Sequence, residues 1–195
     1  MTRIKCFLVE PTGSCRRFLR RYSFRKSEGD HFHNAMIHLD DVHSPQDCGD
    51  NWPHDDPRWP THCECGYEFL PNDEWQLFVQ SVYCRSDTGE LTTLSHPREP
   101  GMMWYLDSEY ATDFYGVGLD GRTLSVQTPG GQWVIDSRAN NCTRPDDKGH
   151  RCWVRHGVPP EINVDKAGDT CAAGAGSIMC GNYHGFLRNG YLEEC

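Results

Sequence analysis

The sequence predicts an α+β protein built mostly from antiparallel β hairpins, with one or two helices and a zinc-knuckle-like element near residues 48–66. Composition favours strands joined by turns, because the chain has 19 Gly and 12 Pro, with 37% hydrophobic and 11% aromatic residues for a core. Turn residues also separate short alternating apolar runs. We expect residues 1–195 to form one domain, or one domain with a metal-bound sub-lobe over residues 27–70.

Turn signals place the hairpins. The first is expected to join Ile4–Val9 to Cys15–Phe24 through a Pro11–Ser14 turn, although an amphipathic helix competes with its second arm. Further hairpins are predicted for Gln76–Cys84 with Glu90–Leu94, for Leu124–Gln127 with Trp133–Ile135, for Ile162–Val164 across residues 165–169, and for Phe186–Leu187 with Tyr191–Leu192. One helix is expected from Pro100 to Gly116, where apolar residues recur every four positions.

Charge is unevenly distributed along the chain. Residues 1–26 carry a net charge of +7 and the remainder carries −16, which gives −9 overall. A basic segment of this kind can contact nucleic acid or an acidic protein partner, or it can pack against acidic surface of its own chain. The candidate contact residues are Arg16, Arg17, Arg20, Arg21, Arg25 and Lys26. Nucleic acid is the less favoured partner, because the rest of the chain is acidic.

The chain shows no membrane signal, since no apolar run approaches 18 residues and charge interrupts the N-terminal segment too early for a secretion signal. We therefore expect a reducing cytosol, where most of the 11 cysteines would be thiols or metal ligands. The odd number excludes complete pairing within one chain. A particle that leaves the cell would be an exception, because its thiols could oxidise later.

The strongest chemical motif is the Trp59–Tyr67 stretch, which contains two cysteines one residue apart, followed by a glycine. Zinc binds about four thiolate or imidazole ligands, and two of them often come from one tight turn. The candidate ligands are His33, His43, Cys48, His62, Cys63 and Cys65, where His62 with Cys65 restores the usual gap of two residues. In the alternative interpretation, the cysteines are small buried apolar residues and the histidines are solvated.

Three further groups carry weaker signals. Cys142, His150, Cys152 and His156 suit a second metal site or part of the first, because a strand would place the last three on one face. Cys171 could act as a nucleophile activated by His184 or His156. The favoured explanations are a half-buried strand for the first of these groups and a tightly packed small-residue segment for the second. The Asp pairs at 40–41, 55–56 and 146–147 fit solvated turns better than a calcium loop.

Several strings together resemble an uncharacterised family of small Cys/His-containing proteins encoded by tailed bacteriophages and prophages. They are residues 56–61, 65–69, 133–136, 151–157, 170–178 and 184–187. The resemblance covers the chain from about residue 30 onward. It implies a phage origin and a setting in the host bacterial cytoplasm or the virion, and it implies no catalytic residues.

We therefore expect a non-enzymatic bacteriophage protein, a zinc-stabilised structural or interaction module that binds a phage or host protein. One alternative is a zinc- or cysteine-dependent hydrolase acting on a host molecule, with Glu64 or Asp47 as the base beside an open zinc site. Another is a nucleic-acid binder that uses the basic N-terminal segment.

Overall fold

A computed structural model of the chain describes residues 3–26, 32–43, 52–95, 97–147, 149–166, 171, 173 and 176–195. The chain divides into two compact units. The first unit comprises Met1–Glu10, Arg85–Glu90 and Ser95–Cys195, and the second comprises Pro11–Cys84 and Leu91–Leu94. The sub-lobe expected over residues 27–70 falls within the second unit.

Strands dominate both units, and the antiparallel, β-rich prediction is confirmed. The first unit contains β1 (Arg3–Lys5), β6 (Met102–Tyr105), α1 (Glu109–Tyr115), β7 (Leu124–Thr128), β8 (Gly131–Val134), β9 (Val154–Val158), β10 (Glu161–Asp165), β11 (Ile178–Cys180), β12 (Tyr183–Arg188) and β13 (Tyr191–Glu194). The second contains β3 (Phe32–His43), most of β4 (Glu74–Arg85) and β5 (Leu91–Thr93). The long β2 (Phe7–Lys26) contributes to both. In the described part of the chain, α1 is the single helix, and it is too short to cross a membrane.

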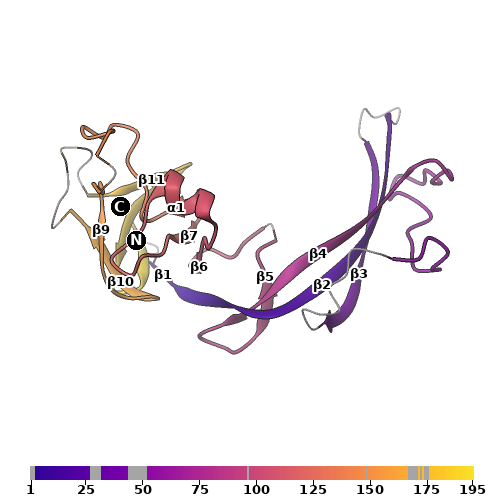
Figure 1. The fold of residues 1–195 in the computed structure, drawn as a ribbon, viewed down its shortest axis with the longest axis horizontal. Coiled ribbons are helices and arrows are strands. Elements are labelled where there is room, and N and C mark those ends of the chain that lie inside the picture. Colours follow the sequence, from indigo (N-terminus) through magenta and orange to yellow (C-terminus); the bar gives the residue numbers. More distant parts are fainter. Residues whose placement is uncertain are drawn as a thin grey trace. The chain divides into compact units, whose positions relative to one another are not determined.

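Three sets of strands build the first unit (Figure 1). One sheet has the order β1-β13-β12-β11, β9 pairs with β10, and β6, β7 and β8 pair in sequence, with β6 parallel to the start of β2. Apolar side chains from these strands meet in one core, because alternate positions of each strand point inward. Its fully buried members include Met103, Leu124, Ile162, Leu187 and Leu192.

Turn chemistry locates three hairpins correctly. β12 and β13 are joined by Asn189 and Gly190, both with left-handed backbone at φ 47° and 71°, as a tight turn between twisted strands requires. The predicted β7–β8 and β4–β5 hairpins also form. These three predictions are confirmed, because each depends on local residues alone.

Other sequence-based expectations are wrong. The Pro11–Ser14 segment does not turn back, since β2 continues through it, and β1 pairs with β13 instead. The expected helix from Pro100 to Gly116 is a strand followed by a seven-residue helix, because three consecutive buried residues, Met102 to Trp104, pair with neighbouring strands. Finally, Ile162–Val164 pairs backward with β9, whereas most of the expected turn, residues 167–169, lies outside the described part of the chain.

The second unit is a sheet with one face covered by a loop. β3 runs antiparallel to β2, with Leu19 opposite Ile37 and Arg17 opposite Leu39 (Figure 1). Leu19, Leu39 and Trp59 are buried together, with Trp52 and Trp75 packed against them. The core of this unit therefore depends on residues 52–75, of which only the last two belong to a strand.

Candidate metal centres

Four side chains of the first unit bring their ligand atoms together. Cys142, His150, Cys152 and Cys171 each offer one sulfur or nitrogen, and these atoms all lie within 4.8 Å of one another. Cys152 and His150 are fully buried, while Cys142 and Cys171 are half-buried. We call these residues the four-residue group.

Connections between strands supply all four residues. Cys142 lies in the connection from β8 to β9, His150 and Cys152 lie just before β9, and Cys171 follows β10. The described part of the β8–β9 connection, residues 135–147 and 149–153, contains turns but no helix or strand. Loops of that length are uncommon in compact proteins unless something other than backbone pairing holds them. The group joins this connection to the one after β10.

Two distances within the four-residue group suit a tetrahedral metal site. The Cys152 sulfur lies 3.7 Å from the Cys171 sulfur and 3.7 Å from Nε2 of His150. Zinc–sulfur bonds of about 2.3 Å and zinc–nitrogen bonds of about 2.0 Å place tetrahedral ligand atoms roughly 3.5–3.8 Å apart. The spacing also far exceeds a disulfide bond of about 2.05 Å. The sulfurs are therefore placed to share a cation.

Backbone amides donate hydrogen bonds to two sulfurs of the group. The amides of Arg144 and Ala173 donate to the sulfurs of Cys142 and Cys171, each two residues earlier, at 3.4 Å. Hydrogen bonds from the amides of Thr143 and Ala173 lower the pKa of Cys171 to about 5.

The pKa of the neighbouring Cys152 thiol is shifted in the opposite direction. Burial, together with the adjacent thiols, raises the pKa of Cys152 to about 12. Three sulfurs this close cannot all ionise without a positive charge between them, and a bound divalent cation would supply that charge.

One atom of the group differs from a usual zinc ligand. Nδ1 of His150 is buried and has no hydrogen-bond partner among the described residues. The second nitrogen of a zinc-bound histidine usually donates a hydrogen bond that fixes the ring. Here burial alone fixes the His150 ring, whose residue has 0% exposure.

A second group lies in the second unit and contains three of the predicted ligands. His33, Cys63 and Cys65 bring their ligand atoms within 4.8 Å of one another. His62 does not join them, and its Nδ1 instead lies 2.9 Å from the Thr61 hydroxyl. The His43 side chain and the whole of Cys48 lie outside the described residues.

The sequence reasoning named three members of the four-residue group and missed its geometry. It grouped Cys142 with His150, Cys152 and His156, and it placed the last three on one face of a strand. The structure starts β9 at Val154, so His150 and Cys152 lie in a loop, and His156 instead contacts Asp165 at 3.0 Å. Cys171 was proposed as a nucleophile. Only the return of the chain after β10 brings it to Cys152, a contact that no local spacing predicts.

The proposed catalytic pairing of Cys171 is not formed. His184 Nε2 lies 3.0 Å from the Ser177 hydroxyl, and His156 contacts Asp165. The imidazole beside Cys171 is His150, within the four-residue group. Glu64 is exposed, and Asp47 lies outside the described residues.

The basic segment packs largely against aromatic rings of its own unit. Arg21 is 5% exposed, lies 3.7 Å from the centre of the Trp75 ring and donates to the Leu70 carbonyl at 2.6 Å. Arg17 lies over Trp52. Cation–π contacts of this kind are internal packing interactions. The predicted contact residues have the following positions: Arg16, Arg17 and Arg20 are half-buried, Arg21 is buried, Arg25 is exposed, and the Lys26 side chain lies outside the description.

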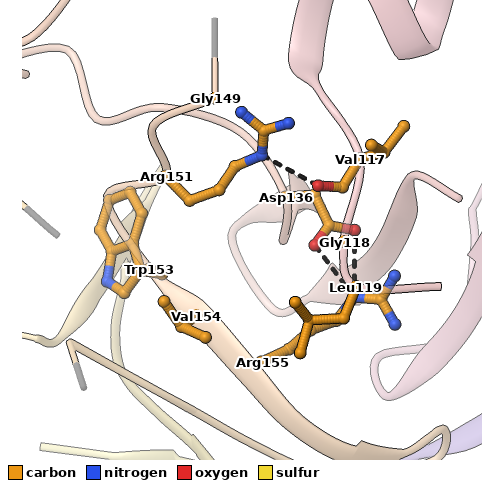
Figure 2. A pocket seen from close by; sticks show the side chains of 9 residues that line it. All are labelled: Val117, Gly118, Leu119, Asp136, Gly149, Arg151, Trp153, Val154 and Arg155. Carbon is orange, nitrogen blue, oxygen red and sulfur yellow. Dashed lines mark hydrogen bonds and ion pairs between the residues drawn. The ribbon is translucent and has the colours of Figure 1, made fainter. Parts of the chain in front are cut away.

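A cavity of about 400 Å³ in the first unit is lined in part by Gly149, Arg151 and Trp153, the sequence neighbours of His150 and Cys152. Arg151, between two candidate ligands in sequence, forms part of its wall and donates from Nε to the Val117 carbonyl at 2.9 Å (Figure 2). Arg155 donates to Asp136 at 2.9 Å, and both side chains are at most 6% exposed (Figure 2). Among the residues that the structure describes, Asp136 is the one carboxylate lining this cavity, and both of its oxygens accept from the Arg155 guanidinium.

Redox state differs in part from the expectation. Nine of the described cysteines form no disulfide, whereas Cys15 is disulfide-bonded. Comparisons with protein-family models, with curated proteins and with solved structures find no match. Function must therefore be argued from the two Cys/His groups.

Proposed function

We propose that this chain is a zinc-stabilised, non-enzymatic module with a structural or protein-binding role, in which the four-residue group holds the ion. The observation that carries the proposal is the 3.7 Å spacing from the Cys152 sulfur to both His150 and Cys171, which suits tetrahedral coordination. Three thiolates and one imidazole favour zinc over calcium or magnesium, which prefer oxygen ligands.

A structural role fits a ligand set that is complete. Catalytic zinc sites keep a position for water or substrate, whereas four protein ligands fill a tetrahedron. His150 and Cys152 have 0% exposure, which leaves little access for a substrate. The histidines proposed to activate Cys171 are hydrogen-bonded elsewhere. These observations favour the structural module over the hydrolase.

The binding role is supported by exposed apolar side chains. Leu119 and Val158 are 92% and 77% exposed and line one cavity of about 350 Å³ in the first unit. Apolar groups left in solvent around a hollow are typical of surfaces that contact another protein. The bacteriophage setting, in the host cytoplasm or the virion, is supported by the resemblance of the quoted strings alone.

Removal of the metal tests the structural role. Trp133 and Trp153 form an edge-to-face pair with ring centres 5.6 Å apart, and Trp153 follows the candidate ligand Cys152. We expect a strong chelator to abolish the near-ultraviolet circular dichroism of this pair, and zinc, but not magnesium, to restore it. A protein that loses its metal and keeps the full signal would refute a structural role for the ion.

A further inference from the structure

The three-residue group of the second unit has its own structural logic. His33 belongs to β3, whereas Cys63 and Cys65 belong to a small hairpin that covers the sheet. Nδ1 of His33 lies 3.2 Å from the Cys65 sulfur, close to the roughly 3.5 Å edge of a zinc tetrahedron. The group therefore links β3 to the loop within residues 52–75, on which the core of the second unit depends.

The hairpin over residues 61–69 resembles the tight turn that supplies two of the four ligands in many structural zinc sites. The Cys63 amide donates to the Tyr67 carbonyl, and the Gly66 amide donates back to the Cys63 carbonyl, both at 2.9 Å. Gly66 has a φ of 88°, a left-handed conformation that glycine adopts without strain. This turn places both sulfurs on the side that faces β3.

Backbone amides surround the Cys63 sulfur. The amides of Cys65, Asn34 and Glu64 donate hydrogen bonds to it. The Cys65 amide stands two residues after the sulfur that it stabilises. The four-residue group shows the same relationship at Cys142 and Cys171.

A buried network fixes the His33 ring. The ring stacks on Tyr67 with centres 3.8 Å apart and planes 5° from parallel. The Tyr67 hydroxyl donates to the buried Asp73 carboxylate at 3.1 Å, and the Leu70 amide donates to the same oxygen at 2.8 Å. A ligand held in one orientation before the ion arrives loses little entropy on binding.

We propose that His33, Cys63 and Cys65 form a second zinc site, so that each unit carries its own ion. The site is independent of the four-residue group, because its ligands and their supports all belong to the second unit. The Cys65 residue is exposed, whereas His150 and Cys152 of the first site are fully buried. The second ion is therefore expected to leave first when a chelator is added.

Native mass spectrometry of the zinc-loaded full chain tests this proposal. We expect two zinc ions in the original protein, one in Cys63→Ser, one in Cys152→Ser and none in the double variant. Cys195→Ser is the matched control, because Cys195 is an exposed free thiol outside both groups, and it should keep two ions. One zinc ion in the original protein that persists in Cys63→Ser would overturn the second site. One ion that persists in Cys152→Ser but not in Cys63→Ser would support it and refute the first site.

A spectroscopic measurement protects the test against a variant that fails to fold. Cobalt(II) added to the Cys152→Ser protein should give a thiolate-to-cobalt charge-transfer band, because Cys63 and Cys65 would be its sulfur ligands. His33→Gln in the same background should weaken that band and weaken cobalt binding at least tenfold. A Cys152→Ser protein that takes up cobalt without any thiolate band would contradict the proposal.

Discussion

The sulfurs of Cys152 and Cys171 lie 3.7 Å apart although 19 positions separate the two residues. The hairpin formed by β9 and β10 occupies most of that interval and returns the chain to its starting point. The sulfurs are too distant to be bonded and too close to be ionised together in a buried place without a cation. This relationship is the basis of the metal-binding account.

Loss of the Cys152 thiol should destabilise the first unit. We expect Cys152→Ser to lower the melting temperature by about 10 °C or more. Loss of a structural metal ligand costs several kcal/mol of unfolding free energy, and each kcal/mol lowers the melting temperature of a chain of this size by roughly 2–4 °C. Differential scanning calorimetry measures the effect. Cys195→Ser should melt like the original protein, and equal melting of Cys152→Ser would contradict the role of this thiol.

The buried ion pair beside the cavity should contribute independently of the metal. Asp136→Asn leaves the Arg155 guanidinium, 6% exposed, without its buried carboxylate, and should cost about 3 kcal/mol of unfolding free energy. Urea denaturation measures this loss. Asp107→Asn is the control, because Asp107 pairs with Arg122 at the surface and should cost under about 1 kcal/mol. Equal costs for the two substitutions would show that the Asp136 pair is no stronger than a surface pair.

The raised pKa of Tyr183 predicts that the folded state loses stability at alkaline pH. Burial and nearby acidic groups raise its pKa from 10.0 to about 12. The folded state therefore keeps a proton that the unfolded state releases, so this stabilisation is complete below pH 10 and disappears between about pH 10 and 12. Tyr183→Phe should flatten the stability curve in that window, as measured by urea denaturation at successive pH values. An unchanged slope would mean that the hydroxyl titrates normally.

The basic segment should matter more for folding than for binding. Arg21→Ala removes a buried guanidinium from the Trp75 ring and the Leu70 carbonyl, and should cost about 2–3 kcal/mol. The exposed Arg25 provides the control, since Arg25→Ala should change stability by less than about 0.5 kcal/mol. Chemical denaturation measures both. The nucleic-acid alternative would be favoured instead if single-stranded DNA retained the original protein in a salt-dependent way and both substitutions weakened that retention.

Sequence patterns predicted the β-rich class and the hairpins with short turns, because Asn189-Gly190 and similar pairs act locally. They failed where distant pairing decides the structure. Pro11–Ser14 reads as a turn, yet β2 continues because the Thr12 hydroxyl donates to the Val82 carbonyl, 70 residues away. Met102 begins a run of apolar residues spaced by four, as in a helix, yet the pairing of Met102–Trp104 with β2 and β7 makes this segment a strand.

The candidate sites also depend on contacts between distant residues, which a sequence alone does not predict. Cys63 and Cys65 were identified from their spacing, and their partner His33 was one of several histidines in an unpatterned region. The four-residue group was only partly identified, because Cys171 comes from a separate connection that no ligand spacing links to Cys152. Closely spaced ligands can be read from a sequence, whereas convergence of separate loops requires the fold.

Zinc K-edge X-ray absorption on the Cys63→Ser protein tests the central claim most directly, because this variant should retain only the ion of the four-residue group. The account predicts one zinc with three sulfur neighbours at about 2.3 Å and one nitrogen neighbour at about 2.0 Å. A first shell made of oxygen and nitrogen alone, or a folded protein without zinc, would contradict it.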